Sequence, residues 1–139
     1  MSSSFLEDLT RTLKRHEGLE LKPYRCTAGK LTIGIGRNLE DVGISEAEAE
    51  FLLRNDVEVV VAALDDRIPW WSTLPTGKRV VLASMAFQLG VGGLFKFRKF
   101  LAAAEEGDDL EAVAQMRDSA WYRQTTNRVE DLIKRWNEA

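Results

Sequence analysis

The chain has 139 residues, of which 45% are hydrophobic and 29% are charged, with a formal net charge of −3. This length and composition are typical of one globular domain, and the slightly acidic balance argues against a nucleic-acid-binding protein. No run approaches the ~18 apolar residues of a membrane span, and the single cysteine, Cys26, excludes an internal disulfide and suits a reducing compartment.

The first predicted element is a helix over residues 4–16. Apolar residues recur there at helical spacing, and a serine at or near position 4 can cap the helix. This helix is expected to end at Gly18, which places Glu17 at its C-terminus. Residues 19–36 follow as a hairpin region, in which glycines alternate with β-branched residues and mark a bend or a close approach. Residues 38–43 are predicted to be a loop.

A long connecting helix is predicted next, over about residues 45–66. Ser45 and Glu48 have the spacing of a capping box, and ~20 residues of helix span ~30 Å. Its apolar residues are expected to point inward: Phe51, Leu52, Val57, Val60, Val61 and Leu64. Pro69 and Pro75 mark the connection that follows, and the Trp70–Trp71 pair between them is expected to pack rather than to bind sugar.

The rest of the chain is predicted to be helical. Residues 76–89 are apolar almost all round, which is typical of a central buried helix. Glycines at 90, 92 and 93 are expected to stop it, and a shorter helix should end near Gly107. Three more helices are predicted from candidate caps at Asp108 or Asp109, Ser119 and Thr125.

These elements predict an α+β protein with one hairpin and about seven helices. We expect a single domain over residues 1–139, with a β lobe at about 17–44. The helix at about 45–66 connects it to a larger helical lobe, which comprises about 70–139 together with the N-terminal helix 4–16.

Three segments of the chain carry a motif. Glu17, Cys26 and Thr32 are separated by eight and five residues, and IGIG follows the threonine. FQLG at 87–90 and WYRQTTNR at 121–128 come later. In this order and spacing the three segments resemble the phage lysozymes, glycoside hydrolase family 24, over nearly the whole chain.

The resemblance implies a lysozyme-like fold and a muramidase that hydrolyses the β-1,4 bond between N-acetylmuramic acid and N-acetylglucosamine in peptidoglycan. Glu17 is then the general acid. A helix C-terminus and partial burial both favour the neutral carboxyl group that this role needs. The resemblance also implies that Arg128, near the other end of the chain, reaches back to Glu17, where its planar guanidinium suits a carboxylate.

Cys26 stands where well-known members of the family carry an aspartate. As a thiolate it would serve as a base or stabilise positive charge, provided that a cation such as Arg25 or Arg37 lowers its pKa. As a neutral thiol it is a small half-buried hydrophobe. Thr32 is the residue expected to hold the water of an inverting reaction, because its hydroxyl both accepts and donates.

Gln88 and Gln124 are the candidates for substrate binding, because amides suit sugar hydroxyls and N-acetyl groups. Trp121 and Tyr122 are expected in the core. His16, the one histidine, receives no role, and one histidine with one cysteine makes no credible metal site, so no metal or cofactor is expected. Cations are frequent in the last third, as a solvated surface or a basic face: Lys96, Arg98, Lys99, Arg117, Arg123, Arg128, Lys134 and Arg135.

By resemblance the chain is a phage or prophage endolysin whose partner is bacterial peptidoglycan. The start of the chain shows neither the basic region nor the apolar run of a signal peptide. We therefore expect a monomer that stays in the host cytoplasm until a holin opens the membrane. Two alternatives stay open: a lytic transglycosylase, which uses a single glutamate and no water, and an inactive saccharide-binding protein.

Overall fold

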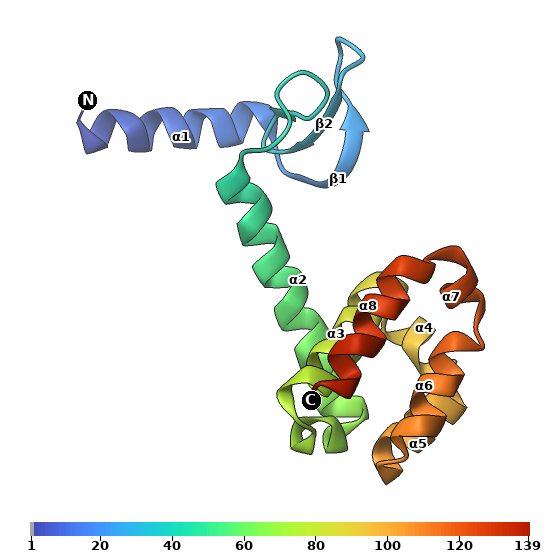
Figure 1. Ribbon diagram of the computed structural model, residues 1–139. Helices are drawn as coiled ribbons and strands as arrows, with labels where there is room; N and C mark the ends of the chain where they lie inside the picture. The colour runs from blue at the N-terminus through green and yellow to red at the C-terminus, as the bar shows by residue number, and fades with distance from the viewer. Residues whose placement is uncertain (1) are drawn as a thin grey trace. The chain divides into compact units, whose positions relative to one another are not determined.

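The computed structural model describes residues 2–139, which separate into two units at the bond between Phe51 and Leu52. A small antiparallel sheet lies in the first unit, and helices make up most of the second (Figure 1). The α+β, lysozyme-like fold class predicted from the sequence is therefore confirmed. No helix within residues 2–139 combines the length and the apolar character needed to cross a membrane.

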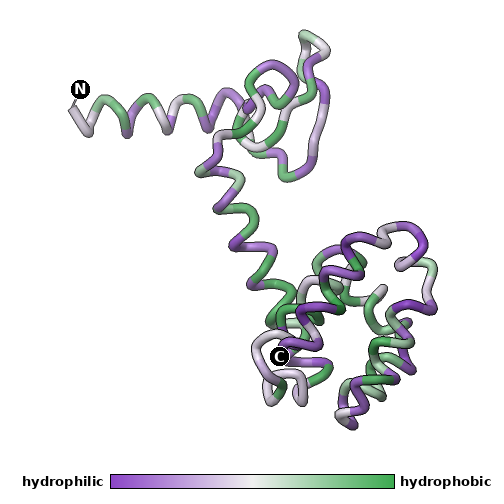
Figure 2. Tube along the Cα trace, viewed as in Figure 1, coloured by the Kyte–Doolittle hydropathy of each residue, from purple (hydrophilic) through white to green (hydrophobic). Residues whose placement is uncertain are grey.

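The first unit begins with α1 (Ser3–Glu17), which is capped by Ser2, whose Oγ accepts from the Phe5 N–H at 3.2 Å. Polar and apolar stretches alternate along it (Figure 2). Its apolar residues remain 41–49% exposed: Phe5, Leu6, Leu9 and Leu13. The helix itself was predicted correctly, whereas its assignment to the helical lobe stays a prediction.

Three strands follow α1, in the order β1 (Glu20–Arg25), β2 (Leu31–Gly34) and β3 (Arg37–Asn38). All neighbours are antiparallel, and β2 is central, with Thr32 opposite Tyr24 on one side and Asn38 on the other. The sequence predicted only a hairpin, with a loop from residue 38 onward. Asn38 instead belongs to a third strand, because the chain turns back beside β2 before the loop begins.

The helix α2 (Glu46–Arg67) starts in the first unit and continues into the second. Its predicted capping box is confirmed: the Glu48 N–H donates to Ser45 Oγ at 3.1 Å, and the Ser45 N–H donates to Glu48 Oε1 at 2.9 Å. Of the residues expected to point inward, only Leu64 is fully buried, while Phe51, Leu52 and Val57 are 45–57% exposed. The inward prediction was wrong for these three, because the core of the second unit packs only against the later turns of α2.

The second unit continues with a 3₁₀ helix, η1 (Pro69–Thr73), and six α-helices. These are α3 (Thr76–Leu89), α4 (Val91–Phe95), α5 (Arg98–Glu106), α6 (Asp109–Arg117), α7 (Ala120–Gln124) and α8 (Thr126–Asn137). The predicted stop after α3 is only partly right, since Gly90 ends the helix but α4 forms directly across Gly92 and Gly93. The caps at Asp108 and Ser119 are confirmed, with their side chains accepting from Glu111 N–H and Tyr122 N–H.

The core of the second unit lies around α3 and α8. Its largest fully buried side chains are Trp136, Phe100, Leu64, Leu82, Met85, Leu94, Met116, Val81 and Val129. Trp71, 6% exposed, packs in the same cluster, as expected of the tryptophan pair. Val80 and Phe87 are each 46% exposed, so α3 is buried along most of its surface but not all round.

Candidate active site

Glu17 is the last residue of α1, and Gly18 caps the helix by donating its N–H to Lys14 O at 3.0 Å. The Glu17 carboxyl group lies against the backbone of Gly36, in the turn between β2 and β3. A β-carbon placed on Gly36 would come within 2.7 Å of Glu17 Oε2 and 2.9 Å of its Cδ. Gly36 also has a φ of +67°, a region that side chains disfavour. The last glycine of the TIGIG run therefore makes room for the carboxyl group.

The surroundings of Glu17 differ from the expectation in one respect. Partial burial was expected to favour its neutral form, but the residue is exposed within the described structure. Within the first unit, the contact with Gly36 is therefore on an exposed surface.

Cys26 begins the turn that joins β1 to β2. Its N–H donates to Lys30 O at 3.0 Å, and its own carbonyl accepts from the Gly29 N–H at 2.8 Å. The half-buried thiol has a pKa below its ordinary value, chiefly because the backbone of Lys30 and then that of Ala28 hydrogen-bond the sulfur, with burial opposing the shift. The Thr32 side chain adds a smaller lowering. The structure thus brings Cys26 and Thr32 together.

The expected cause of this lowered pKa was wrong. Arg25 and Arg37 were the cations named from the sequence, and each is engaged elsewhere. Arg25 Nη1 lies 3.4 Å from Glu40 Oε1 and donates to Gly29 O at 3.0 Å, while Arg37 pairs with Glu48. Backbone N–H groups of the turn lower the pKa of the thiol instead, as in other turns that stabilise anions.

Thr32 is central in the sheet and only 3% exposed, which makes it the one buried side chain among residues 2–51. Its hydroxyl donates to Lys30 O at 2.8 Å. Its single proton serves either Lys30 O or the Cys26 sulfur, so only its lone pairs are left for a further partner. A water beside Thr32 would therefore donate to it.

Gln88 and Gln124 lie in the second unit. Gln88, near the end of α3, accepts on Oε1 from the Trp121 indole N–H at 2.9 Å. This fixes the amide and leaves its NH₂ group free to donate. Gln124 ends α7 and is exposed, and none of the side-chain hydrogen bonds found in residues 2–139 involves it.

Arg128 lies in the first turn of α8 and is exposed, with no ion pair to any residue from 2 to 139. Glu17 and Arg128 belong to different units. Their pairing therefore stays a prediction. Within the same described range, no group of three histidine, cysteine or acidic side chains is arranged to hold a metal ion.

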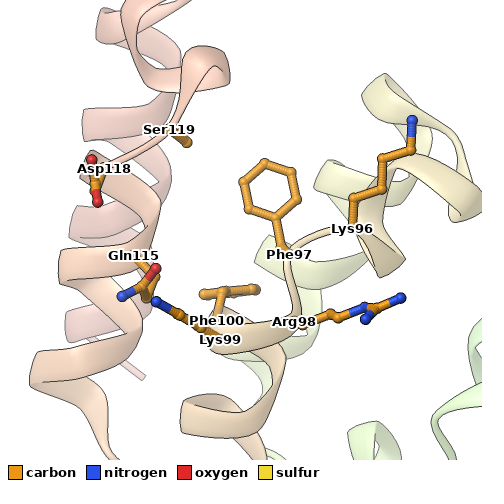
Figure 3. Close-up of a pocket in the computed structure, with 8 residues that line it drawn as sticks. All are labelled: Lys96, Phe97, Arg98, Lys99, Phe100, Gln115, Asp118 and Ser119. Atoms are coloured by element: carbon orange, nitrogen blue, oxygen red, sulfur yellow. The ribbon is translucent and has the colours of Figure 1, made fainter.

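The second unit has a hollow of about 430 Å³, not predicted from the sequence, between the start of α5 and the end of α6 (Figure 3). The Phe97 ring stands in it and meets the Trp121 ring edge-on, with centroids 5.9 Å apart. The hollow thus adjoins the tryptophan that holds Gln88. The residues around it are Lys96, Phe97, Arg98, Lys99, Phe100, Gln115, Asp118 and Ser119. Only the excess of cations near residues 96–99 hinted at it.

Comparison with known proteins gives a consistent picture. The family model described as "Phage lysozyme" matches residues 14–139. The endolysin of Acyrthosiphon pisum secondary endosymbiont phage 1 is 37% identical, over 88% of this chain and 86% of the relative. A probable T4-type lysozyme of Dictyostelium discoideum is 28% identical, over 94% of this chain and 92% of the relative. The pre-baseplate central spike protein of Enterobacteria phage T4 is 32% identical over 87% of this chain, which spans only 26% of that relative.

Proposed function

The chain belongs to the phage lysozyme family, and from this premise we propose that it degrades peptidoglycan as a muramidase. The bond cleaved is the β-1,4 link between N-acetylmuramic acid and N-acetylglucosamine. One observation carries the proposal: the carboxyl group of Glu17 lies against Gly36, on the same small sheet that carries Thr32 and the turn with Cys26. The names of the relatives, endolysin and lysozyme, support the same class of activity.

In the proposed reaction, Glu17 gives its proton to the leaving glycosidic oxygen. A water held by Thr32 attacks the anomeric carbon from the opposite face, so the configuration inverts. The Thr32 hydroxyl accepts a hydrogen bond from that water, since its own proton is donated to Lys30 O or to the Cys26 sulfur. The Cys26 thiolate takes the proton that the attacking water loses, and the turn amides that lower its pKa favour this form.

Substrate is held from the second unit. We assign Gln88 the role of donating its NH₂ group to a sugar oxygen, because Trp121 already occupies its carbonyl oxygen. Gln124, whose amide is exposed, offers both a donor and an acceptor. Gln88→Ala should raise KM more than it lowers kcat, and an unchanged KM would remove it from the site.

We also propose that Arg128 pairs with Glu17 and orients the acid. Arg128→Ala should then lower the rate of lysis, whereas Arg123→Ala, which removes an exposed arginine five residues earlier, should not. Equal rates for the two variants would show that Arg128 has no special relation to Glu17.

The biological setting is likewise a proposal, and the name of one relative, endolysin, supports its first part. As an endolysin, the chain acts as a monomer on host peptidoglycan and depends on a holin to leave the cytoplasm. Expressed alone in the host it should leave cells intact, and co-expression of a holin should lyse them. Lysis without a holin would show another route of export.

The test of the activity is digestion of purified sacculi by the wild type and by Glu17→Gln. The wild type should release fragments whose reducing ends have gained one water, and the variant should release almost none. Anhydro-sugar ends would instead identify the enzyme as a lytic transglycosylase, the second candidate. This candidate is favoured by the presence of Cys26 where a carboxylate base would stand. No fragments from either protein would leave an inactive saccharide-binding protein.

A further inference from the structure

The turn that carries Gly36 is held in place by very little apolar packing. Thr32 is the one buried side chain among residues 2–51, and β3 has only two residues. A hydrophobic core cannot therefore fix the position of this turn. Yet Gly36 lies so close to Glu17 that a β-carbon would fall 2.7 Å from its carboxylate oxygen. Another interaction must fix the distance between the Gly36 backbone and the Glu17 carboxyl group.

Arg37, the next residue, has the contacts that such an anchor needs. Its Nη1 donates to Glu48 Oε1 at 2.8 Å, and its Nη2 lies 2.7 Å from Glu48 Oε2, so the guanidinium grips both carboxylate oxygens. Nη1 also donates to Gly43 O at 3.2 Å. A planar fork of this kind fixes direction as well as distance. Arg37 therefore connects β3 both to α2 and to the end of the loop that precedes α2.

Glu48, on the other side of this pair, is itself immobilised. It is the third residue of α2 and completes the capping box with Ser45, and its Oε1 accepts the Ser45 N–H at 2.9 Å while it holds Arg37. The backbone of Arg37 is fixed in turn by its register opposite Ile33 of β2. The chain of contacts thus runs from a helix terminus, through one ion pair, to the residue beside Gly36.

We propose that Arg37 is a positioning residue for Glu17: its forked ion pair with Glu48 holds the Gly36 backbone against the Glu17 carboxyl group. The inference rests on the proposed role of Glu17 as the acid. The side chains of the pair are 38% and 42% exposed, so it contributes little to global stability and its main effect is geometric. A small displacement of a catalytic group is costly in rate even when the fold persists.

The test compares Arg37→Met with a control that breaks a similar pair elsewhere. Arg117 forms a forked pair with Glu130, at 2.9 and 3.1 Å and with comparable exposure, in the second unit. Arg37→Met should lower kcat on soluble glycan fragments about tenfold while KM stays within about twofold. Arg117→Met should leave kcat within about twofold of the wild type. Arg37→Lys should fall between wild type and Arg37→Met, since it restores the charge without the fork.

A second readout does not depend on activity. The ¹³C signal of the Glu17 carboxyl carbon and the amide signal of Gly36 should both move in Arg37→Met and stay in place in Arg117→Met. Glu48→Gln, which keeps the capping box, should move them in the same way and replaces Arg37→Met if that variant fails to fold. Unmoved signals with a kcat equal to that of Arg117→Met would overturn the inference. If Glu17→Gln still lyses sacculi, the proposed function fails, while these signals still decide whether Arg37 sets the contact.

Discussion

The two units are stabilised by different means. All the buried apolar side chains of residues 2–139 lie in the second unit, from Leu64 to Trp136. The first unit has a sheet and a capping box instead of such a core, and its exposed ion pairs at Glu40, Asp41 and Glu48 fix positions more than they add stability. The candidate acid, base and water-holding residues, Glu17, Cys26 and Thr32, lie in the first unit, whereas Arg128 and the candidate substrate-binding glutamines lie in the second. A large core thus stabilises the second unit, while the three proposed reacting residues lie in a unit with almost no core, so mutations in the two units should affect stability and activity differently.

The largest expected effect on stability is in the core of the second unit. Leu82, 0% exposed, lies in α3 and is part of this core, and Leu82→Ala should cost about 2–5 kcal/mol of unfolding free energy. Leu21→Ala in the first unit removes a side chain that is 80% exposed and should cost no more than about 0.5 kcal/mol. Urea unfolding measures both. Similar costs for the two variants would break the contrast between the units.

The next effect is a difference in activity between two variants of similar stability. Gly36 and Gly34 have nearly the same positive φ, +67° and +73°, but only Gly36 lies near Glu17. Gly36→Ala and Gly34→Ala should therefore lose similar stability, of about 1–2 kcal/mol from backbone strain. Only Gly36→Ala pushes the carboxyl group aside, so its lysis rate should fall about tenfold or more below that of Gly34→Ala. Equal rates would show that the Gly36 contact does not matter for the chemistry.

Cys26 offers a sharper test of what the first unit does. If its thiolate is the base, Cys26→Ser should lose about 10²-fold or more in rate and Cys26→Asp should retain activity. The rate should then rise with pH as the thiol deprotonates, below the ordinary thiol value, because the Lys30 and Ala28 backbone lowers its pKa. Alkylation, specific here because Cys26 is the single cysteine, should inactivate the enzyme. A fully active Cys26→Ser with an unshifted pH profile would make the residue a spacer.

The smallest expected effect is on acid stability. The Arg37 hydrogen bond holds the pKa of Glu48 at about 2, below its ordinary value. The pair therefore contributes fully above about pH 4.5, and its contribution declines as the unfolded chain takes up the proton and is gone below about pH 2. Between these limits the melting temperature of the wild type should fall more steeply than that of Glu48→Gln. Glu50→Gln, which changes an exposed glutamate nearby, should follow the wild type, and parallel curves for all three would contradict the assignment.

Local rules predicted much of this structure from the sequence. The capping box at Ser45, the caps at Asp108 and Ser119, and the helix that ends at Glu17 depend on neighbours within four residues, which a sequence displays directly. The spacing of Glu17, Cys26 and Thr32 likewise led to side chains that share one unit.

What was missed depends on contacts between distant residues or on the backbone. The Arg37–Glu48 pair joins residues eleven apart through a loop, and the Trp121–Gln88 bond joins residues 33 apart. The amides that act on Cys26 belong to the backbone, and no residue type reveals them. The exposed apolar residues of α2 were misplaced for a related reason, since helical spacing shows a face but not how far a core extends along it.

The central claim is that Glu17, held at the Gly36 turn, is the acid of a wall-degrading enzyme. The most direct measurement is the initial rate of sacculus lysis by the wild type, Glu17→Gln and Glu20→Gln, with the melting temperature of each. Glu20 is an exposed glutamate three residues later, in β1. The account predicts that Glu17→Gln loses about 10²–10⁴-fold in rate while its melting temperature and the activity of Glu20→Gln stay unchanged. A Glu17→Gln protein that lyses sacculi within about threefold of the wild type would contradict it.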